Sequence, residues 1–424
     1  MDFAQIEGDF MSVTHIIGAG LAGLSAAVAI THAGGRVKIY EASAMAGGRA
    51  RSYHDKKLGI EIDNGNHMLL SGNHSAKTYL KRIGAEHRFK SPKEAAFSFC
   101  DLSDKERFTI KLSNGPLPWW VLCAKSRVPH SKAKDYLALL SLLLADHNTK
   151  IGDLVPDNTA LWRKLLDPFF VSVLNTPARE GAACLAAAVI RETLMKGGKA
   201  CIPRIAYPSL ASSFIDPALD YLKARGVEVD FRNRLRQIHF SGQDVTSLEF
   251  AHQDVKLGKG DKVIIALPAW VVQSLIPDIE TPDKYQAIIN AHFLMKPTAA
   301  MPHIMGVVGG TADWIFTFEN RISVTISAAN HLLALEKEEL VKRIWDDIQT
   351  VYAFKQDMPE WQVVTEKRAT FEATVEQNNR RPPAVTAWNN LFLAGNWVRT
   401  GLPATIESAI RSGQTAADLA LSHS

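Results

Sequence analysis

VTHIIGAGLAGLSAAVAITHAGGRVKIYE, the stretch from Val13 to Glu41, carries the strongest structural signal in the sequence. Residues 13–17 are apolar and β-branched, which predicts a short strand, and the alanine-rich residues 24–33 predict a helix that two glycines end. Residues 36–40 predict a second strand, which Glu41 follows directly. The order of strand, glycine turn, helix and strand predicts a βαβ unit that binds a dinucleotide.

Three glycines in this stretch form the pattern GxGxxG, and each has its own role. Gly18 permits a tight turn, Gly20 lets the backbone approach a pyrophosphate, and Gly23 lets the helix pack closely on the sheet. Glu41 lies 18 positions after Gly23, where a carboxylate can accept hydrogen bonds from both ribose hydroxyls. The alternative is a glycine-rich turn without a ligand. The strand, the helix and the acid together favour dinucleotide binding.

A second glycine turn follows at once, in the string AMAGGRARS. It contains Gly47, Gly48 and Arg49, and a guanidinium at this place can reach the same pyrophosphate. NAD dehydrogenases lack this feature. The combination resembles the flavoprotein family of amine oxidases and phytoene desaturases, and the resemblance implies that this turn contacts FAD.

Two later segments extend the resemblance to nearly the whole chain. The string GVEVDFRNRLRQI, residues 226–238, resembles the family's returning strand, in which Leu235 would hold the adenine through its backbone, and an ordinary strand is the alternative. The string LFLAGNWVRTGLPATIESAIRSG, residues 391–413, resembles the closing strand, the flavin-contacting loop and the final helix. The resemblance implies FAD contacts from four residues of this string: Gly395, Asn396, Thr405 and Ile406.

Two of these residues distinguish this chain within the family. Relatives usually carry Asp or Glu where this chain has Asn396, so the strength of that contact with FAD is open. Amine oxidases place an aromatic residue where this chain has Thr405, and threonine cannot form a cage for an amine. A small residue at this position resembles the branch of the family that acts on polyenes and terpenoids.

Further strings narrow the resemblance to the squalene-associated FAD-dependent desaturases, which act in hopanoid biosynthesis. These strings are DNGNHMLLSG, VVGGTADW, EKRATF and GLPATIE. The resemblance implies reductive dehydroxylation of hydroxysqualene to squalene, with a long apolar isoprenoid as substrate and an electron donor that the sequence does not identify. One alternative is a carotenoid desaturase or an amine oxidase of the same fold. Another is an escort-like protein that binds prenyl lipids without flavin, which the intact phosphate-binding residues disfavour.

Two residues are candidates for catalysis. His67 lies in the loop after the first FAD segment, and a histidine that is cationic near neutrality can protonate a leaving hydroxyl. A histidine that only supports the site is the alternative. Arg368 lies in EKRATF, where it would position the flavin or bind a polar end of the substrate, and a solvated charge is its alternative. Asp63 is expected to be structural.

The FAD-binding segments are spread along the chain, which predicts an α/β fold with a discontinuous Rossmann-like domain of the glutathione-reductase type. We expect this domain to comprise residues 12–95, 200–269 and 371–424. Residues 96–199 contain leucine and alanine runs at helical spacing and predict a mostly helical insertion that faces substrate or membrane. Residues 270–370 predict an α+β substrate domain, with a strand at 322–328 and a helix at 336–352.

Composition excludes several classes of protein. The chain has 424 residues and a formal net charge of +4, which is too small to attract nucleic acid. Its 4 cysteines and 14 histidines show neither CxxC nor HExxH spacing, which predicts no disulfide framework and no metal site. The first ten residues contain no basic side chain, which predicts no signal peptide and a cytoplasmic location.

Residues 116–145 are the candidate for contact with a membrane. They join Trp119 and Trp120 to four basic residues and the run LALLSLLLA. Indole rings favour the headgroup level, cations favour anionic lipid, and leucines enter the acyl boundary. A buried helix with a solvated basic edge is the alternative. The expected location is peripheral, at the inner face of the cell membrane.

Overall fold

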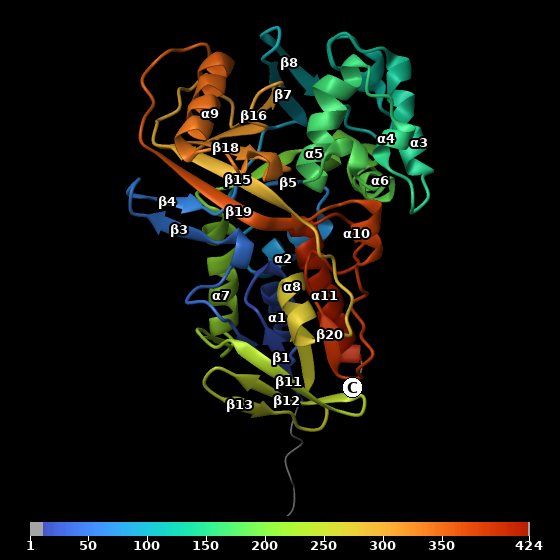
Figure 1. The fold of residues 1–424 in the computed structure, drawn as a ribbon, viewed down its shortest axis with the longest axis vertical. Coiled ribbons are helices and arrows are strands. Elements are labelled where there is room, and N and C mark those ends of the chain that lie inside the picture. Colours follow the sequence, from blue (N-terminus) through green and yellow to red (C-terminus); the bar gives the residue numbers. More distant parts are fainter. Residues whose placement is uncertain (1–11, 423–424) are drawn as a thin grey trace, which may run out of the picture.

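The computed structural model describes residues 12–422, and its lower half in Figure 1 is organised around a parallel sheet. This sheet has five strands, and all four of its pairings are parallel. Its strands alternate in sequence with helices and bury apolar side chains, which is typical of a parallel sheet covered on both faces. In sheet order the strands are β10 (Val229–Asp230), β2 (Arg36–Tyr40), β1 (Val13–Ile17), β14 (Lys262–Ile265) and β20 (Leu391–Leu393).

Helix α1 (Leu21–His32) follows the glycine turn and begins one turn earlier than the sequence predicted. All of its residues from Leu21 to Ile30 are buried, because it is packed between the sheet and other helices. Its closest helical neighbour is α11 (Ile406–Ser422), where a Cβ on Gly413 would lie 2.1 Å from the carbonyl oxygen of Ala22. The other helices of this half are α2 (His74–Arg82), α7 (Asp216–Lys223) and α8 (Ala269–Leu275).

A mixed seven-stranded sheet forms the floor of the upper half. One of its faces packs on α9 (Lys337–Tyr352), whose apolar residues recur at helical spacing. The predicted strand at 322–328 and helix at 336–352 are confirmed. In sheet order the strands are β19 (Trp361–Phe371), β15 (Tyr285–Phe293), β18 (Ile322–Ile326), β17 (Trp314–Thr317), β16 (Ile304–Val308), β7 (Ala96–Asp101) and β8 (Glu106–Lys111).

The last two strands correct the prediction for residues 96–199. This segment opens with β7 and β8, which belong to the sheet, and only its later part is helical. The pairing of β7 with β16 joins residues about 200 positions apart, so no local sequence pattern predicts it. The helices that follow gather on one side of the upper half (Figure 1): α3 (Ala138–Leu143), α4 (Ile151–Leu154), α5 (Asp167–Leu174) and α6 (Ala183–Glu192).

The predicted strand at 226–238 divides into two. Its first part, β10, joins the parallel sheet, and its second part opens an antiparallel sheet at the foot of the molecule (Figure 1). That sheet consists of β11 (Leu235–Ser241), β12 (Asp244–Phe250) and β13 (Asp254–Lys256). The remaining elements connect the halves: β3 (Ser52–Asp55), β4 (Ile60–Asp63), β5 (Met68–Leu70), β6 (Phe89–Lys90), β9 (Pro203–Ala206) and α10 (Val375–Asn379).

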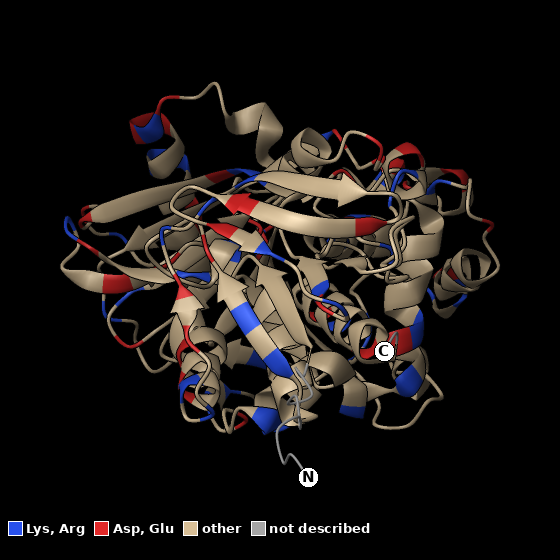
Figure 2. Ribbon diagram, turned by 90° about the horizontal axis from the view of Figure 1, so that it is seen from below, with Lys and Arg blue, Asp and Glu red and all other residues tan. Residues whose placement is uncertain are grey.

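Charged residues of both signs are interspersed in the view from below (Figure 2). Among residues 12–422, no helix has the length and apolar character needed to cross a membrane.

Candidate functional site: a flavin site between the two sheets

The glycine turn after β1 leaves open space at one position only. A Cβ on Gly18 would lie 2.7 Å from the carbonyl oxygen of Ala266, and one on Gly23 would lie 1.8 Å from that of Gly18. Gly18 also adopts a φ of +107°, which favours glycine. A Cβ on Gly20 would meet nothing within 4 Å. The turn and the packing therefore require Gly18 and Gly23, and Gly20 faces the space where a pyrophosphate would approach.

The N-terminus of α1 opens onto the same space. No side chain caps it, and its first turn contains no acidic residue. Its free N–H groups and the positive end of the helix dipole can therefore bind a phosphate. The second glycine turn lies alongside, because the N–H of Gly47 donates to the carbonyl oxygen of Ala19 at 2.8 Å. Gly47 and Gly48 both have positive φ.

Glu41 is held at the edge of this turn. One carboxylate oxygen accepts from the N–H of Ala19 at 2.8 Å, and the other accepts from the N–H of Ser43 at 2.8 Å. The oxygen bound by the N–H of Ser43 also accepts from Oγ of Ser43 at 2.9 Å, so the oxygen bound by Ala19 is the one that keeps a lone pair for a ribose hydroxyl. Gly18, Gly20, Gly23 and Glu41, which the sequence selected, are thus brought together.

Arg49 connects the glycine turns to both the upper sheet and the C-terminal loop. Its Nη1 donates to the carbonyl oxygen of Ala369 in β19 at 2.7 Å, and its Nη2 donates to Oδ1 of Asn396 at 2.9 Å. The amide that replaces the family's usual acid therefore serves as the acceptor for Arg49. Burial lowers the pKa of Arg49, and the negative charge of Glu366 offsets only part of this effect.

The C-terminal loop ends at the start of α11, as expected. Oγ1 of Thr405 accepts from the N–H of Ser408 at 3.1 Å, and Ile406 is the first residue of the helix. The N–H of Gly395 donates to Oγ of Ser412 at 2.8 Å. Since a Cβ on Gly395 would lie 2.5 Å from the indole nitrogen of Trp397, only glycine fits there. Leu235 is buried at the start of β11, opposite Phe250, and its contact with adenine stays a prediction.

His67 lies near Arg49, and its imidazole makes no hydrogen bond or ion pair with any residue in the range 12–422. His67 is partly accessible to solvent, but protein atoms surround most of its ring. Burial, together with the positive charge of Arg49, lowers the pKa of His67 to about 4. The expectation of a cationic imidazole near neutrality is therefore wrong for the chain by itself. An anion bound to Arg49 would offset that charge and raise the pKa of His67.

Arg368 is exposed, and its guanidinium lies 5.0 Å from the ring centroid of Trp270. It makes none of the contacts that join Arg49, Asn396 and Ala369. Burial raises the pKa of Tyr285, and the positive charges of Arg368 and Arg49 both act on Tyr285 to lower it. A role of Arg368 at the flavin or the substrate stays a prediction, with a solvated charge as the alternative.

The loop that carries His67 is fixed by a buried polar network that sequence reasoning missed. Nδ2 of Asn66 donates to Oγ of Ser323 at 2.7 Å and to Oγ1 of Thr325 at 3.1 Å. Thr325 donates in turn to Oδ1 of Asn290 at 2.7 Å. Ser323 also contacts Nδ1 of His292 at 2.8 Å. The sequence contained one signal. Asn290 and His292, and likewise Ser323 and Thr325, are two positions apart in mostly apolar strands, which places each pair on one sheet face.

Asp63, at the end of β4, is structural as expected. Its carboxylate accepts from Oγ of Ser52 at 2.6 Å and from the N–H of Leu210 at 2.8 Å, and Arg321 lies 3.2 Å away.

A second acid, Asp313, was not among the residues that the sequence predicted for the site. It accepts from the N–H of Ser327 at 2.6 Å, and burial raises its pKa to about 7. The next residue, Trp314, donates to Oγ of Ser172 in α5 at 2.5 Å, which places Asp313 where the sheet meets the helices.

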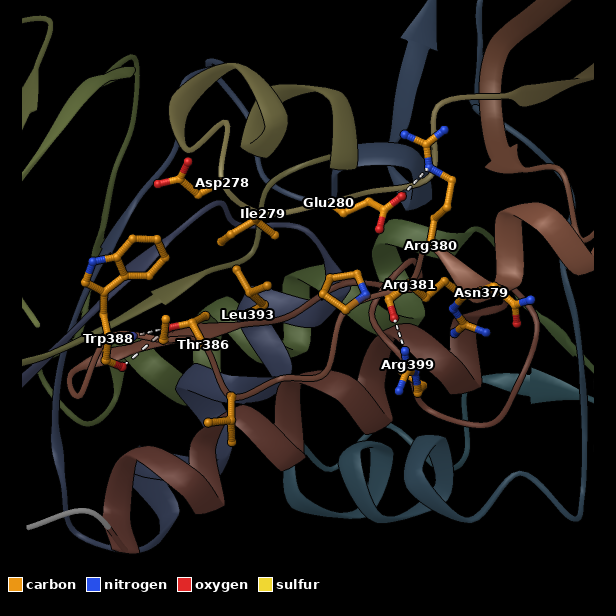
Figure 3. Close-up of a pocket in the computed structure, with 13 residues that line it drawn as sticks. Asp278, Ile279, Glu280, Asn379, Arg380, Arg381, Thr386, Trp388, Leu393 and Arg399 are labelled. Carbon is orange, nitrogen blue, oxygen red and sulfur yellow. Dashed lines mark hydrogen bonds and ion pairs between the residues drawn. The ribbon is translucent and has the colours of Figure 1, made fainter.

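A separate hollow of about 360 Å³ lies behind the C-terminal loop (Figure 3). Its wall includes Arg381, whose guanidinium is buried and donates to the carbonyl oxygens of Trp397 at 3.3 Å and Val398 at 2.7 Å. Arg399 donates to the carbonyl oxygen of Arg381 at 2.9 Å (Figure 3). Arg381 also donates to the carbonyl oxygen of Asn396 at 3.4 Å, so it helps to position Asn396 and its neighbours.

This geometry agrees with the comparisons with known proteins. Residues 21–421 match the family of flavin-containing amine oxidoreductases. The chain belongs to this family. Hydroxysqualene dehydroxylase from Rhodopseudomonas palustris is 47% identical over 408 residues, covering 96% of this chain and 98% of the relative. Hydroxysqualene dehydroxylase from Sinorhizobium fredii is 44% identical, with the same coverage.

The fold of this amine oxidoreductase is likewise shared with solved structures. A putative protoporphyrinogen oxidase from Exiguobacterium superposes with a TM-score of 0.69 at 15% identity, covering 98% of this chain and 100% of that one. The predicted α/β flavoprotein fold is confirmed, and the protein is an FAD-dependent oxidoreductase. The open space at Gly20, the uncapped N-terminus of α1, Glu41 and Arg49 fit FAD.

Proposed function

We propose that this enzyme converts hydroxysqualene to squalene in hopanoid biosynthesis. The observation that carries the proposal is the identity of 47% and 44% to two hydroxysqualene dehydroxylases over nearly the full length of all three chains. Thr405 supports it, because it provides no aromatic wall for an amine.

The reaction replaces a hydroxyl with hydrogen. Protonation releases the hydroxyl as water from an allylic carbon and leaves a delocalised cation, which one hydride then converts to squalene. FAD, when reduced and bound, supplies that hydride. The chain must therefore hold the cofactor, deliver one proton and keep water from the cation.

His67 is the side chain that we propose for proton delivery. Its ring nitrogens have no partner in the described chain, and it precedes the apolar residues Met68, Leu69 and Leu70 of β5. The network around Asn66 fixes its backbone, and burial, with the smaller effect of the Arg49 charge, lowers its pKa. A phosphate on Arg49 would favour the cationic imidazole that donates the proton.

The substrate is a long apolar isoprenoid, and we propose that the enzyme takes it up at the inner face of the cell membrane as a peripheral protein in the cytoplasm. The solubility of such a substrate in lipid supports this location. A separate electron donor must reduce FAD after each turnover, because the reaction consumes one hydride.

The direct test is anaerobic incubation of the photoreduced protein with hydroxysqualene and, separately, with phytoene, followed by mass analysis of the products. We expect squalene from the first and no product from the second. Desaturation of phytoene by the oxidised protein, with hydroxysqualene unchanged by the reduced protein, would replace the proposal with a desaturase.

A further inference from the structure

Exposed apolar side chains are concentrated in one segment of the helical region. Thirteen large apolar side chains are exposed in the described chain, and six of them lie between residues 117 and 144. Leu144 is the most exposed, at 88%. The six are Leu117, Trp119, Leu122, Leu137, Leu140 and Leu144, and we call them the apolar face. Such a concentration marks an interaction surface, since single exposed apolar residues are ordinary but a group of them is not.

The helical geometry separates this face from the core. Leu137, Leu140 and Leu144 follow one another at spacings of three and four, which places them on one side of the turns that lead into α3. Tyr136 and Leu142 point the other way and are buried. The segment is therefore amphipathic, and Leu137, Leu140 and Leu144 lie outside the core.

The two tryptophans are likewise divided between surface and core. Trp119 is 63% exposed, whereas Trp120 packs edge-on against Tyr136, with ring centroids 5.3 Å apart. Of the two indoles in the predicted membrane-contact segment, Trp119 is therefore the one on the surface. The contact between Trp120 and Tyr136 fixes residues 119–122 against the turns before α3 and brings Trp119 and Leu122 into the same part of the surface.

A third segment borders the face. The N–H of Gly198 donates to the carbonyl oxygen of Ser113 at 2.7 Å, which places residues 194–199 next to the segment that leads to Leu117. Met195, Lys196 and Lys199 are all exposed there. The border therefore adds a further apolar side chain and two cations.

The charges around the face have one predominant sign. Residues 112–146 contain four basic residues, Lys125, Arg127, Lys132 and Lys134, and two acids, Asp135 and Asp146. Asp135 accepts a hydrogen bond from the backbone N–H of Lys132 at 2.7 Å. Lys125, Lys132 and Lys134 are exposed and form no ion pair within residues 12–422.

We propose that the apolar face inserts into the headgroup boundary of an anionic phospholipid bilayer, with Lys125, Lys132 and Lys134 bound to the lipid phosphates. An anionic bilayer fits this face, because exposed leucines and an indole can enter the boundary of the acyl chains and the unpaired lysines can bind the negatively charged headgroups. The proposal assigns a face to the membrane association proposed above and rests on it. It orients the antiparallel sheet β11–β13, at the opposite end of the molecule in Figure 1, toward the cytosol.

Sedimentation of the full chain with vesicles tests the face. The double variant Leu140→Glu/Leu144→Glu should bind vesicles of phosphatidylglycerol and phosphatidylcholine at least about 10-fold more weakly, because two apolar anchors become anions. The matched control is Leu333→Glu/Met358→Glu, which changes two apolar residues that are exposed elsewhere. All four positions are on the surface, and circular dichroism of each variant checks the fold.

A second pair of variants tests the lipid charge. Lys132→Glu/Lys134→Glu should remove the preference for anionic over purely zwitterionic vesicles, while Lys256→Glu/Lys259→Glu, at the far end of the molecule, should retain it. Equal binding by the parental chain and both variant pairs on the face would overturn the proposal. A parental dimer that Leu140→Glu/Leu144→Glu makes monomeric, without parental vesicle binding, would make the face an interface between two copies.

Activity on substrate dispersed in detergent separates this proposal from the proposed function. Turnover in detergent by the variants, with loss of vesicle binding, is the expected pattern. Inactivity of the parental protein in detergent would contradict the proposed function while leaving the vesicle result intact.

Discussion

The nucleotide-binding turn and the His67 loop are built on contacts of very different range. At the turn, Ala19 contacts Glu41 and Gly47, which lie within 28 positions of it along the chain. At the loop, Asn66 contacts Ser323 and Thr325, 257 and 259 positions away. The first site uses mostly backbone groups of one continuous segment. The second site forms only once distant parts of the chain have come together. Substitutions at the turn should therefore affect FAD binding, and substitutions at the loop should affect the rate of the reaction.

The largest effect is expected at the local site. Glu41→Arg should abolish retention of FAD, because it puts a cation where ribose hydroxyls need an acceptor and leaves the N–H groups of Ala19 and Ser43 without partners. Flavin content of the purified protein is the measurement. The control Glu61→Arg changes an exposed acid in β4 and should keep the protein yellow. Full occupancy in Glu41→Arg would show that the turn does not hold the ribose.

At the long-range site, His67→Ala should keep FAD and slow dehydroxylation by about 100-fold or more, the scale of general acid catalysis. His67→Gln, which keeps a polar side chain, should be equally slow if proton transfer is the role. Single-turnover rates of the photoreduced protein across pH are the measurement. Parental rates in both variants would make His67 structural, and a slow Asp313→Asn would then assign the proton to that carboxyl.

The Arg49 and Asn396 pair joins the two regions and should give an intermediate effect. Asn396→Ala removes the acceptor that Nη2 of Arg49 uses at 2.9 Å. A hydrogen bond to a charged group contributes about 1.5–3 kcal/mol, so FAD should bind at least about 10-fold more weakly. Asn396→Asp, which restores the acid usual in the family, should bind FAD at least as tightly as the parental chain. Titration of the apoprotein with FAD measures both, and unchanged affinity in Asn396→Ala would exclude the pair from cofactor binding.

The remaining prediction concerns the pH dependence of stability. Burial, with the nearby charge of Arg321, lowers the pKa of His292 to about 3, so the folded chain stays unprotonated there when the unfolded chain binds a proton. This contribution to stability is complete above pH 6.5 and is lost as the pH falls toward 3. Each unit of pH below 6.5 costs about 1.4 kcal/mol.

His292→Asn should therefore flatten the decline of the thermal midpoint between about pH 6.5 and pH 4. The measurement is the difference in slope between the parental chain and the variant, because the raised pKa of Asp313 changes stability in the opposite direction in both. Identical slopes would show that His292 is protonated or solvated in the folded protein.

Local sequence determined the nucleotide-binding half of this protein. Gly18, Gly20, Gly23 and Glu41 could be assigned because their roles depend on backbone conformation and helix geometry within about 30 residues. The strand at 391–393 and the start of α11 were predicted from the resemblance to the flavoprotein family.

The tertiary structure alone decided the rest. It gave Asn396 a partner in Arg49, placed Arg368 beside Trp270 and set the pKa of His67 well below its ordinary value. It also put β7 and β8 into the substrate sheet and turned Trp120 inward while leaving Trp119 exposed. Burial and the electrostatic field at a side chain are sums over neighbours that lie hundreds of positions away in the chain. No local pattern contains those sums, and so the chemistry of the site emerged only when the two sheets met.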